Sequence, residues 1–294
     1  MNVPSYGTPL AFKKALEDRL RNDAPARLVR NRQLLVFERF LARIVQELDC
    51  VVLKGGFALE LRTKTARTTK DIDLRLSGSP DEALVKLQRA GRLDLVDFMA
   101  FEVASDNDHP DIQNEGMPYV GKRFRVECRL AGKQYGEPFG VDVAFGDPMV
   151  NHVEIVTAPD TLGFARIAPP KLPLYPIETH IAERLHAYTI PRVNPNSRVK
   201  DLPDIALLAT VRSIEARTLM AAFDATFKFR NTHQIPTDLP LPPIKWREAY
   251  AKLAKDNGLP WADLDSVTAK AQAFLNPALA HQAGTTWDPK VWHW

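Results

Sequence analysis

The 294-residue sequence has few cysteines and no long apolar run. Its two cysteines, Cys50 and Cys128, stand in apolar, strand-like contexts, which indicates buried thiols in a reducing compartment and excludes a disulfide scaffold or a cysteine-zinc site. No window approaches the ~20 uninterrupted apolar residues that a membrane span needs. Charges separate the apolar residues of the N-terminus, unlike those of a signal peptide. The sequence therefore predicts a cytoplasmic protein without a membrane partner.

Several well-known catalytic motifs are also missing. The chain has no G-x-x-x-x-G-K-[ST], G-x-G-x-x-G, H-E-x-x-H or G-x-S-x-G, which argues against P-loop, Rossmann, zinc-protease and α/β-hydrolase chemistry. Hydrophobic residues make up 45% and charged residues 26%, as in a globular protein and unlike a disordered one. The net charge of +3 is too small to indicate a nucleic-acid partner by itself.

The periodicity of the apolar residues changes past the middle of the chain. Up to residue 160, helical stripes alternate with strand-like runs, which predicts helices at 12–20, 34–48 and 79–91 and strands at 50–53, 71–76, 123–130, 139–145 and 153–156. After the proline-rich stretch 168–176, helical patterns follow at 177–188, 202–210, 213–230, 244–256 and 262–275, with no clear strand after residue 160. These patterns predict an α/β (α+β) domain over residues 1–165 and a mainly α-helical domain over residues 166–294.

The sharpest chemical feature is the pair Asp71 and Asp73 on a predicted strand. Residues i and i+2 of a strand project to the same face, roughly 6.6 Å apart along the strand. Two carboxylates held that close repel each other unless a cation lies between them, and Mg²⁺ prefers such oxygen ligands. An exposed strand can also carry such a pair by chance, so the pattern taken alone is weak.

The segment before this pair favours a phosphate ligand. Lys54, Gly55 and Gly56 end a predicted buried strand and begin a short helix. Glycines there let backbone N–H groups approach phosphate oxygens beside a helix N-terminus. Arg67 and Thr69 then add a cation and a hydroxyl next to the carboxylates. The alternative is a tight strand-to-helix turn that binds nothing.

A third carboxylate, Asp142, interrupts the apolar run 139–145. A charge inside a strand is costly unless it is paired or bound to metal. Two interpretations stay open: an ion pair with Arg123 or Arg125, or a role beside Asp71 and Asp73 in metal binding or nucleophile activation.

Basic residues crowd the stretch between the glycines and the end of the Asp71 strand. Such a cluster is either a solvated surface or a binding site for a polyanion such as RNA or a triphosphate. We expect its side chains to reach solvent and to hold an RNA backbone; the residues are Arg62, Lys64, Arg67, Lys70 and Arg75.

In combination, these segments resemble the nucleotidyltransferase superfamily of the DNA polymerase β type. Within it, the sequence is most similar to the AbiEii/AbiGii toxin family of prokaryotic toxin–antitoxin systems, which includes the mycobacterial MenT toxins. The similarity is carried by residues 53–76, 141–145 and 177–208, and by the tryptophan-rich end at 287–294. It implies a nucleotidyltransferase core with a mixed sheet in residues 1–165 and a helical C-terminal domain.

The resemblance also implies roles for individual residues. Gly55 and Gly56, with Lys54, Arg67 and Thr69 nearby, would bind the triphosphate, and Asp71, Asp73 and Asp142 would bind Mg²⁺. In the later block, Arg184 stands where the family usually has lysine, so a guanidinium would hold phosphate but could not titrate. Lys200 and Asp204 keep the family pattern, although Asp201 and its neighbours also suit a helix N-terminus. Phe57 stands where many members have serine or threonine.

The resemblance implies a Mg²⁺-dependent enzyme that moves NMP from an NTP to an acceptor hydroxyl. The implied acceptor is RNA, with the 3′ end of tRNA as the expected position, and the protein would be a toxin whose partner is a cognate antitoxin. Three alternatives remain: a catalytically decayed nucleotide- or RNA-binding module, or a transferase that modifies a protein or a small-molecule hydroxyl.

Overall fold

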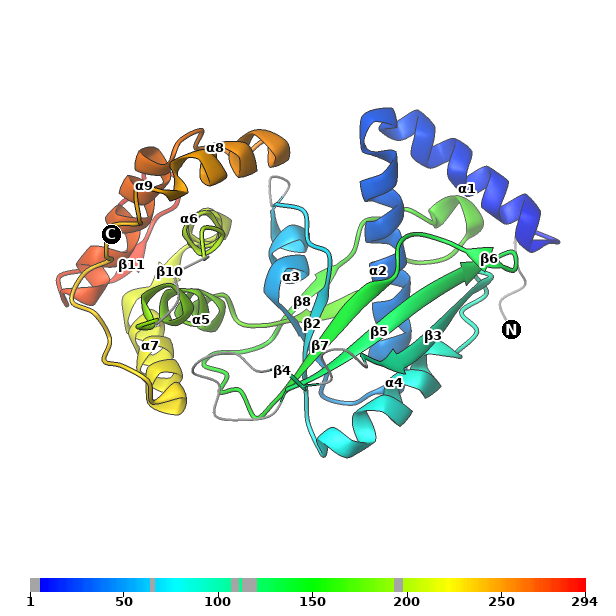
Figure 1. Ribbon diagram of the computed structural model, residues 1–294, viewed down its shortest axis with the longest axis horizontal. Coiled ribbons are helices and arrows are strands. Elements are labelled where there is room, and N and C mark those ends of the chain that lie inside the picture. Colours follow the sequence, from blue (N-terminus) through cyan, green and yellow to red (C-terminus); the bar gives the residue numbers. More distant parts are fainter. Residues whose placement is uncertain (1–5, 64–66, 107–110, 113–120, 193–197) are drawn as a thin grey trace.

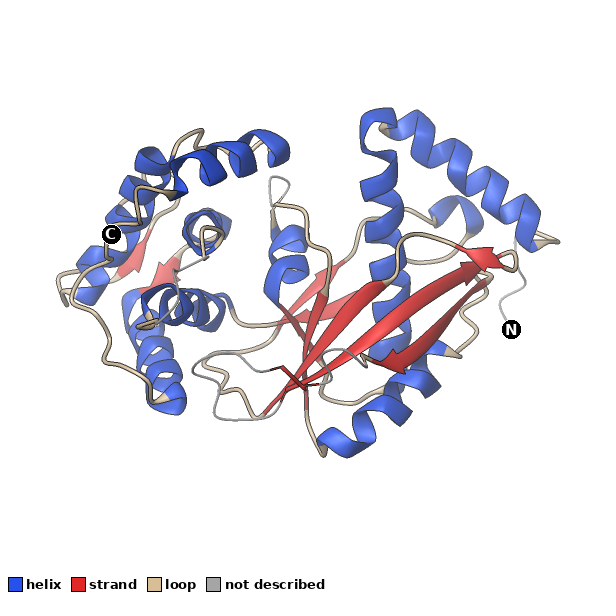
Figure 2. Cartoon of the chain, in the orientation of Figure 1, coloured by secondary structure: helices blue, strands red, loops and turns tan. Residues whose placement is uncertain are grey.

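A mixed β-sheet and the helices that cover it form the N-terminal half of the chain (Figures 1 and 2). The computed structural model describes residues 6–63, 67–106, 111–112, 121–192 and 198–294. Strand order is β3-β5-β7-β2-β1-β9-β8, with β4 and β6 also paired to β5. The strands are β1 (Val52–Lys54), β2 (Ile72–Leu76), β3 (Met99–Ser105), β4 (Asp111–Ile112), β5 (Gly121–Leu130), β6 (Lys133–Gln134), β7 (Phe139–Phe145), β8 (Glu154–Thr157) and β9 (Lys171–Leu174).

The sheet is mixed because β2 pairs parallel with β7, and β1 with β9, while the other pairs are antiparallel. In β2, Ile72, Leu74 and Leu76 are buried, so Asp73 and Arg75 face the opposite side of the sheet. The alternation predicted from the sequence is therefore confirmed, as are the mixed sheet and the antiparallel pairing of β5 with β7.

Four helices belong to this half, and α2 and α4 pack against each other. They are α1 (Pro9–Asp23), α2 (Leu28–Glu47), α3 (Gly55–Arg62) and α4 (Ala83–Gly91), with single 3₁₀ turns at Pro25–Arg27, Pro80–Glu82 and Gly163–Ala165. The predicted helix stripes are buried, as in Phe12, Leu16 and Leu20 of α1. On α2, Arg43 is fully buried, and its guanidinium donates to both carboxylate oxygens of Asp97 at 2.6 and 2.9 Å.

The described residues of the C-terminal half form five helices and a short β-ribbon, drawn from yellow-green to red in Figure 1. The predicted helices are confirmed as α5 (Ile177–Thr189), α6 (Asp201–Val211), α7 (Ala216–Arg230), α8 (Trp246–Asn257) and α9 (Leu264–Leu279), while β10 (Ile214–Glu215) pairs with β11 (Thr286–Trp287). The tail is fixed by Trp287, which is fully buried and donates from Nε1 to the carbonyl of Ala209 at 2.8 Å.

The buried apolar residues form two hydrophobic cores, and α3 contributes residues to both. The first core ends at Leu174, and the second contains residues from Ile177 onward. Phe57 and Ala58 of α3 belong to the first core, whereas Leu59 belongs to the second. The short helix that begins at the glycine pair is thus held between the two halves.

Two expectations from the sequence are wrong: that no strand follows residue 160, and that Cys50 is buried. Residues 171–174 form β9 inside the main sheet, so a strand does follow residue 160, although prolines surround it. The predicted domain boundary at 165/166 is not tested and stays a prediction. Cys50 is exposed because it lies in the turn before β1, with φ of +56°, whereas Cys128 is buried as expected. Within the described ranges, none of the helices combines the length and the apolar character that crossing a membrane requires.

Candidate active site

The three carboxylates predicted from the sequence come together on two neighbouring strands. Asp73 of β2 lies directly beside Asp142 of β7 in the parallel register, and Asp71 immediately precedes β2. The backbone N–H of Gly140 donates to Asp71 Oδ1 at 3.3 Å. Asp73 has no hydrogen-bond partner among the described residues. All three lie on the face of the sheet away from Ile72 and the first core.

Burial and neighbouring acidic charge raise the pKa of both Asp73 and Asp71. Burial raises the pKa of Asp73 to about 6, and the neighbouring Asp142 adds to this shift. Burial and Asp142 also raise the pKa of Asp71. Negative charge in this position is therefore unfavourable without a cation. Carboxylate oxygens crowded in this way suit a hard divalent ion, although no group of three or more His, Cys, Asp or Glu residues in the described parts is already arranged to hold one.

Gly55 and Gly56 let the polar side chains reach the first turn of α3. A Cβ atom on Gly55 would lie 1.8 Å from Asp73 Oδ2, and Gly55 has φ of +68°, so only glycine fits there. A Cβ atom on Gly56 would lie 2.7 Å from Thr69 Oγ1. The glycine pair therefore brings the Asp73 carboxylate and the Thr69 hydroxyl to the N-terminus of α3, where the first N–H groups of a helix favour anions.

Asp142 forms an ion pair with Arg123, which is one of the two arrangements that the sequence leaves open. Arg123 lies directly opposite on β5, and its guanidinium donates to both carboxylate oxygens at 2.6 and 2.7 Å. This ion pair is the predicted alternative to metal binding. Since Asp71 and Asp142 both raise the pKa of the Arg123 guanidinium, the arginine supplies a positive charge to the carboxylate cluster.

The Lys54 ammonium group belongs to a buried ion-pair network. Its Nζ donates to Asp147 at 2.5 Å and to Glu183 at 2.8 Å, and Arg230 of α7 contacts the same two acids. Burial opposes the charge on Lys54, but Glu183 and Asp147 outweigh this and raise its pKa. Lys54 therefore links β1 to the helical half, and this arrangement does not favour the expected contact with a triphosphate.

A second network holds the remaining predicted residues. Asp204 is fully buried and accepts two hydrogen bonds from Arg67, both at 3.0 Å. Arg184 lies 3.3 Å from Asp201 and 3.4 Å from Asp204. Burial opposes its charge, yet Asp204, Asp201 and Asp73 together raise the pKa of Arg184. Arg184 is therefore a permanent cation close to Asp73.

Lys200 is exposed at the start of α6, and partial burial and Arg67 lower its pKa. The structure therefore brings every predicted site residue to the junction of the sheet, α3, α5 and α6. It pairs both Arg67 and Arg184 with Asp204, and it leaves Lys200 facing solvent.

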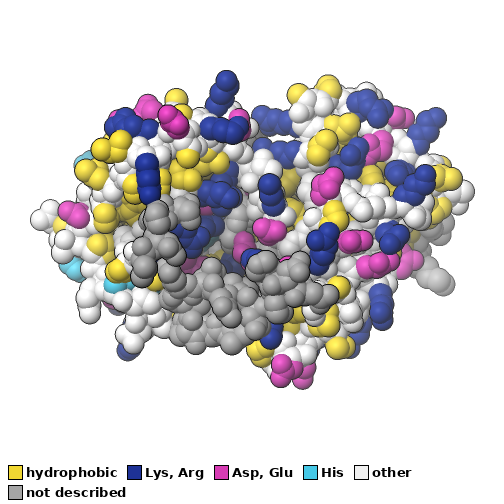
Figure 3. All heavy atoms as spheres, in the orientation of Figure 1, with side chains coloured by type: hydrophobic (Ala, Val, Ile, Leu, Met, Phe, Trp, Pro, Cys, Tyr) yellow, Lys and Arg dark blue, Asp and Glu magenta, His cyan; other side chains and the backbone are white. Residues whose placement is uncertain are grey.

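The expectation that the side chains of the basic stretch reach solvent is wrong in part, and RNA binding by this stretch stays a prediction. Arg75 is half-buried and donates from Nε to the carbonyl of Asp147 at 2.9 Å. The Arg62 side chain is only 2% exposed and donates to Glu154 and to the carbonyl of Tyr175. Arg67 is buried against Asp204, whereas Lys70 is exposed. Lys64 lies outside the described residues. On the face drawn in Figure 3, Lys and Arg side chains gather near the middle of the molecule, between its two halves.

Sequence reasoning missed Asp147 and underestimated Glu183. Asp147 follows Gly146 and precedes Pro148, a pattern typical of a turn, yet it is fully buried against Lys54. Glu183 lies in the 177–208 block, where its position beside Arg184 on a helix is also typical of a solvated ion pair. The signal for both is Lys54 itself, because a lysine at the end of an apolar strand needs acidic partners when it is buried.

The fold and the site define a class: a mixed-sheet transferase core with clustered carboxylates beside a glycine-initiated helix, joined to a helical domain. The model of the family described as nucleotidyl transferase AbiEii toxin, type IV TA system, matches residues 39–274. The chain belongs to this family. It is thus a nucleotidyltransferase of the toxin type, and membership implies an NTP substrate and an antitoxin partner.

Two solved structures are similar to this chain, and the first of them supports the fold assignment. The nucleotidyltransferase toxin MenT4 from Mycobacterium tuberculosis is 16% identical with a TM-score of 0.53, over 91% of this chain and 99% of that one. JHP933 from Helicobacter pylori is 14% identical with a TM-score of 0.49, over 85% and 93% of the two chains. The search of curated proteins gave no match.

Proposed function

We propose that the protein transfers a nucleoside monophosphate from an NTP to an RNA hydroxyl in a Mg²⁺-dependent reaction, with the 3′ end of tRNA as the acceptor to test first. The observation that carries this proposal is the Asp73 carboxylate. It has no hydrogen-bond partner among the described residues, lies beside Asp142, and packs on Gly55 at the start of α3. This arrangement supports a site that is completed by a cation and a phosphate.

In this reaction the acceptor oxygen forms a bond to the α-phosphorus of the NTP, and the bond to the β-phosphate oxygen breaks to release pyrophosphate. Bound Mg²⁺ would supply the positive charge that neutralises the triphosphate and lowers the pKa of the acceptor hydroxyl. Asp71 and Asp73 would hold the ion. Asp142 would join them or accept the proton of the acceptor, in either case with its orientation set by Arg123.

The chain also offers groups for the phosphates. The first N–H groups of α3, at Gly55 and Gly56, favour an anion. Arg184 supplies fixed positive charge near Asp73, and the exposed Lys200 and Lys70 can contact phosphates of the NTP or of the acceptor. Asp204 would act indirectly, because it positions Arg67 and Arg184.

The proposal is tested by incubating the purified protein with total tRNA and each labelled NTP, with Mg²⁺ or with EDTA. We expect label in tRNA only with Mg²⁺, and none with Asp73→Asn. Asp224→Asn removes an exposed carboxylate of α7 and should label tRNA like the wild type. Label in a protein or in a small molecule, and none in tRNA, would show that the acceptor is not RNA. Binding of NTP with no transfer to any acceptor would support the decayed binding module.

A further inference from the structure

A cavity of about 860 Å³ lies between α1, α2, α3 and the loop 159–164, apart from the candidate active site. None of Asp71, Asp73 and Asp142 lines it. Its volume lies in the range of small-molecule sites. Its walls combine charged and polar side chains with apolar ones, and the apolar ones include Leu16, Leu20, Leu34, Leu35, Phe57 and Phe164.

One charged group in this cavity distinguishes it from a simple packing gap. Glu38 of α2 lines the cavity, is 4% exposed, and has no hydrogen bond or ion pair with any described residue. Every other buried carboxylate in the described ranges has an arginine or lysine partner; these are Asp97, Asp147, Glu178, Asp201 and Asp204. An unpartnered buried carboxylate is costly, and here it faces space that a ligand can fill.

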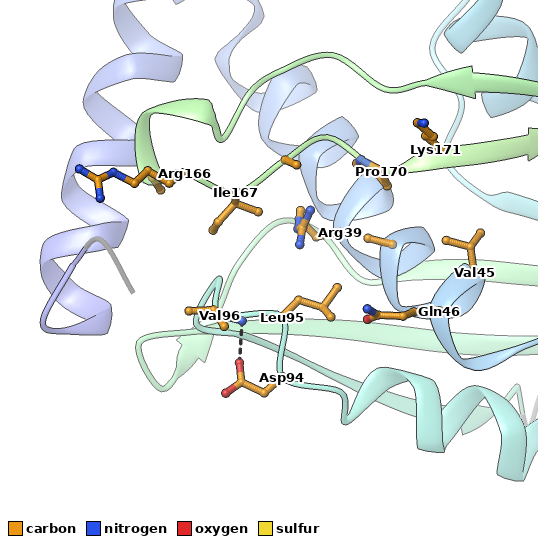
Figure 4. Close-up of a pocket in the computed structure, with 13 residues that line it drawn as sticks. Arg39, Val45, Gln46, Asp94, Leu95, Val96, Arg166, Ile167, Pro170 and Lys171 are labelled. Atoms are coloured by element: carbon orange, nitrogen blue, oxygen red, sulfur yellow. Dashed lines mark hydrogen bonds between the residues drawn. The ribbon is translucent and has the colours of Figure 1, made fainter. Parts of the chain in front are cut away.

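A neighbouring pocket of about 460 Å³ differs from this cavity because charged side chains that line it have partners (Figure 4). Arg39 and Asp94 both line it. The Asp94 carboxylate accepts a hydrogen bond from the backbone N–H of Val96 at 2.8 Å, and Arg39 Nε donates to Asp97 at 2.8 Å. Arg39 and Asp94 therefore both have partners within the chain, unlike Glu38.

The charges around Glu38 indicate the sign of its ligand. Burial raises the pKa of Glu38 to about 7; Arg39 opposes the shift, and the carboxylate of Asp160 adds to it. Of the four arginines in the lining, Arg30 binds Glu60, Arg62 binds Glu154, Arg19 lies over the ring of Phe164, and Arg27 is exposed. None of the four forms an ion pair with Glu38, so its ionised carboxylate would attract a cation and repel an anion.

We propose that this cavity binds a small organic cation, with a primary ammonium group on Glu38 and an apolar body against Leu16, Leu35 and Phe57. The ammonium donates to the Glu38 carboxylate and gives it the partner that the other buried acids already have. The apolar body covers leucine and phenylalanine surface, which favours binding through the hydrophobic effect. This site goes beyond the proposed transferase function, and it lies on α3 at Phe57, Glu60 and Leu61.

The proposal is tested with n-hexylamine as probe, by calorimetry and thermal unfolding of the full chain. We expect hexylamine to bind and to raise Tm, and n-hexanol and hexanoate to bind at least tenfold more weakly. Affinity for the amine should rise about tenfold from pH 6 to pH 8, because the ionised fraction of Glu38 rises from about a tenth to about nine tenths when its pKa is about 7.

Glu38→Gln keeps the shape of the side chain and removes its charge. We expect this variant to fold with a higher Tm than the wild type and to lose the effect of hexylamine. Asp18→Asn changes an exposed acid of α1 outside the cavity lining and should bind the amine as the wild type does. Equal binding of amine and alcohol, equal binding by wild type and Glu38→Gln, or no binding of amine at all would each overturn the proposal. None of these outcomes bears on nucleotide transfer, which the tRNA assay measures separately.

Discussion

Replacing Asp73 with asparagine should stabilise the metal-free protein while abolishing transfer. The folded protein raises the pKa of this carboxyl from 3.8 to about 6, first through burial and then through Asp142. The folded state therefore binds a proton more tightly than the unfolded state. Between these two pKa values the free energy of unfolding falls as pH rises, and above pH 6 the loss is complete.

The size of this destabilisation follows from the rise in the pKa of Asp73. About 2.2 pKa units at 1.36 kcal/mol each give a destabilisation of about 3 kcal/mol above pH 6. Because the Asp73 side chain is partly exposed, solvent screening reduces this, and we expect about 1–3 kcal/mol. Asparagine cannot ionise, so Asp73→Asn should recover this amount at pH 7.5. The advantage of the variant should grow by roughly 1 kcal/mol between pH 5 and pH 7.5.

The assay is urea unfolding in EDTA at both pH values, with the exposed Asp224→Asn as the control. Adding Mg²⁺ and NTP should then raise the Tm of the wild type more than that of Asp73→Asn, since a ligand stabilises only the state that binds it. A variant no more stable than the wild type at pH 7.5 would refute the electrostatic account of the site. A variant that transfers nucleotide at the wild-type rate would refute the metal assignment.

Four further changes probe the surroundings of the site and the two cores. Arg123→Ala should lower the Tm of the metal-free protein but increase the Tm gain on adding Mg²⁺, since Asp142 loses its cation; equal gains would contradict this. Asp97→Asn should cost about 3–5 kcal/mol in urea unfolding, because it leaves buried guanidinium charge without a partner, and a cost below about 1 kcal/mol would contradict the ion-pair role. Trp287→Ala should cost about 3–5 kcal/mol by the same measurement, and a cost below about 1 kcal/mol would show that other contacts hold the tail. Arg184→Lys should lower both stability and transfer, because lysine cannot contact two acids through a planar fork; unchanged Tm and rate would show that only the charge matters.

Local patterns predicted the elements well where one face of an element is buried. The strand at Asp71–Leu76 is an example, because its alternation is required by the core beneath Ile72 and Leu74. The pairing of Asp73 with Asp142 could not be predicted from local pattern, since β2 and β7 are distant in sequence and meet in parallel register. The apolar stripe of α2 does indicate that Glu38 is buried, because Glu38 lies four residues after Leu34 and therefore on the same helix face.

The errors about basic residues have a common physical origin. A run of arginines looks like a solvated surface when its acidic partners are remote, and Arg62 and Arg67 find theirs in Glu154 and Asp204. Both acids belong to segments that approach α3 only through the tertiary fold. Local charge density therefore overestimates the cations available to bind RNA.

The arginine at position 184 has a different meaning in the structure than in the sequence alone. As a substitute for lysine, it raises doubt about activity because a guanidinium cannot exchange protons at neutral pH. In the fold, Arg184 is half-buried beside Asp204 and Asp201 and lies near Asp73, and these acids raise its pKa further. The planar guanidinium can contact both acids while its charge acts on Asp73. A role as a fixed cation that binds phosphate is compatible with arginine, and only a proton-transfer role would be lost by the substitution.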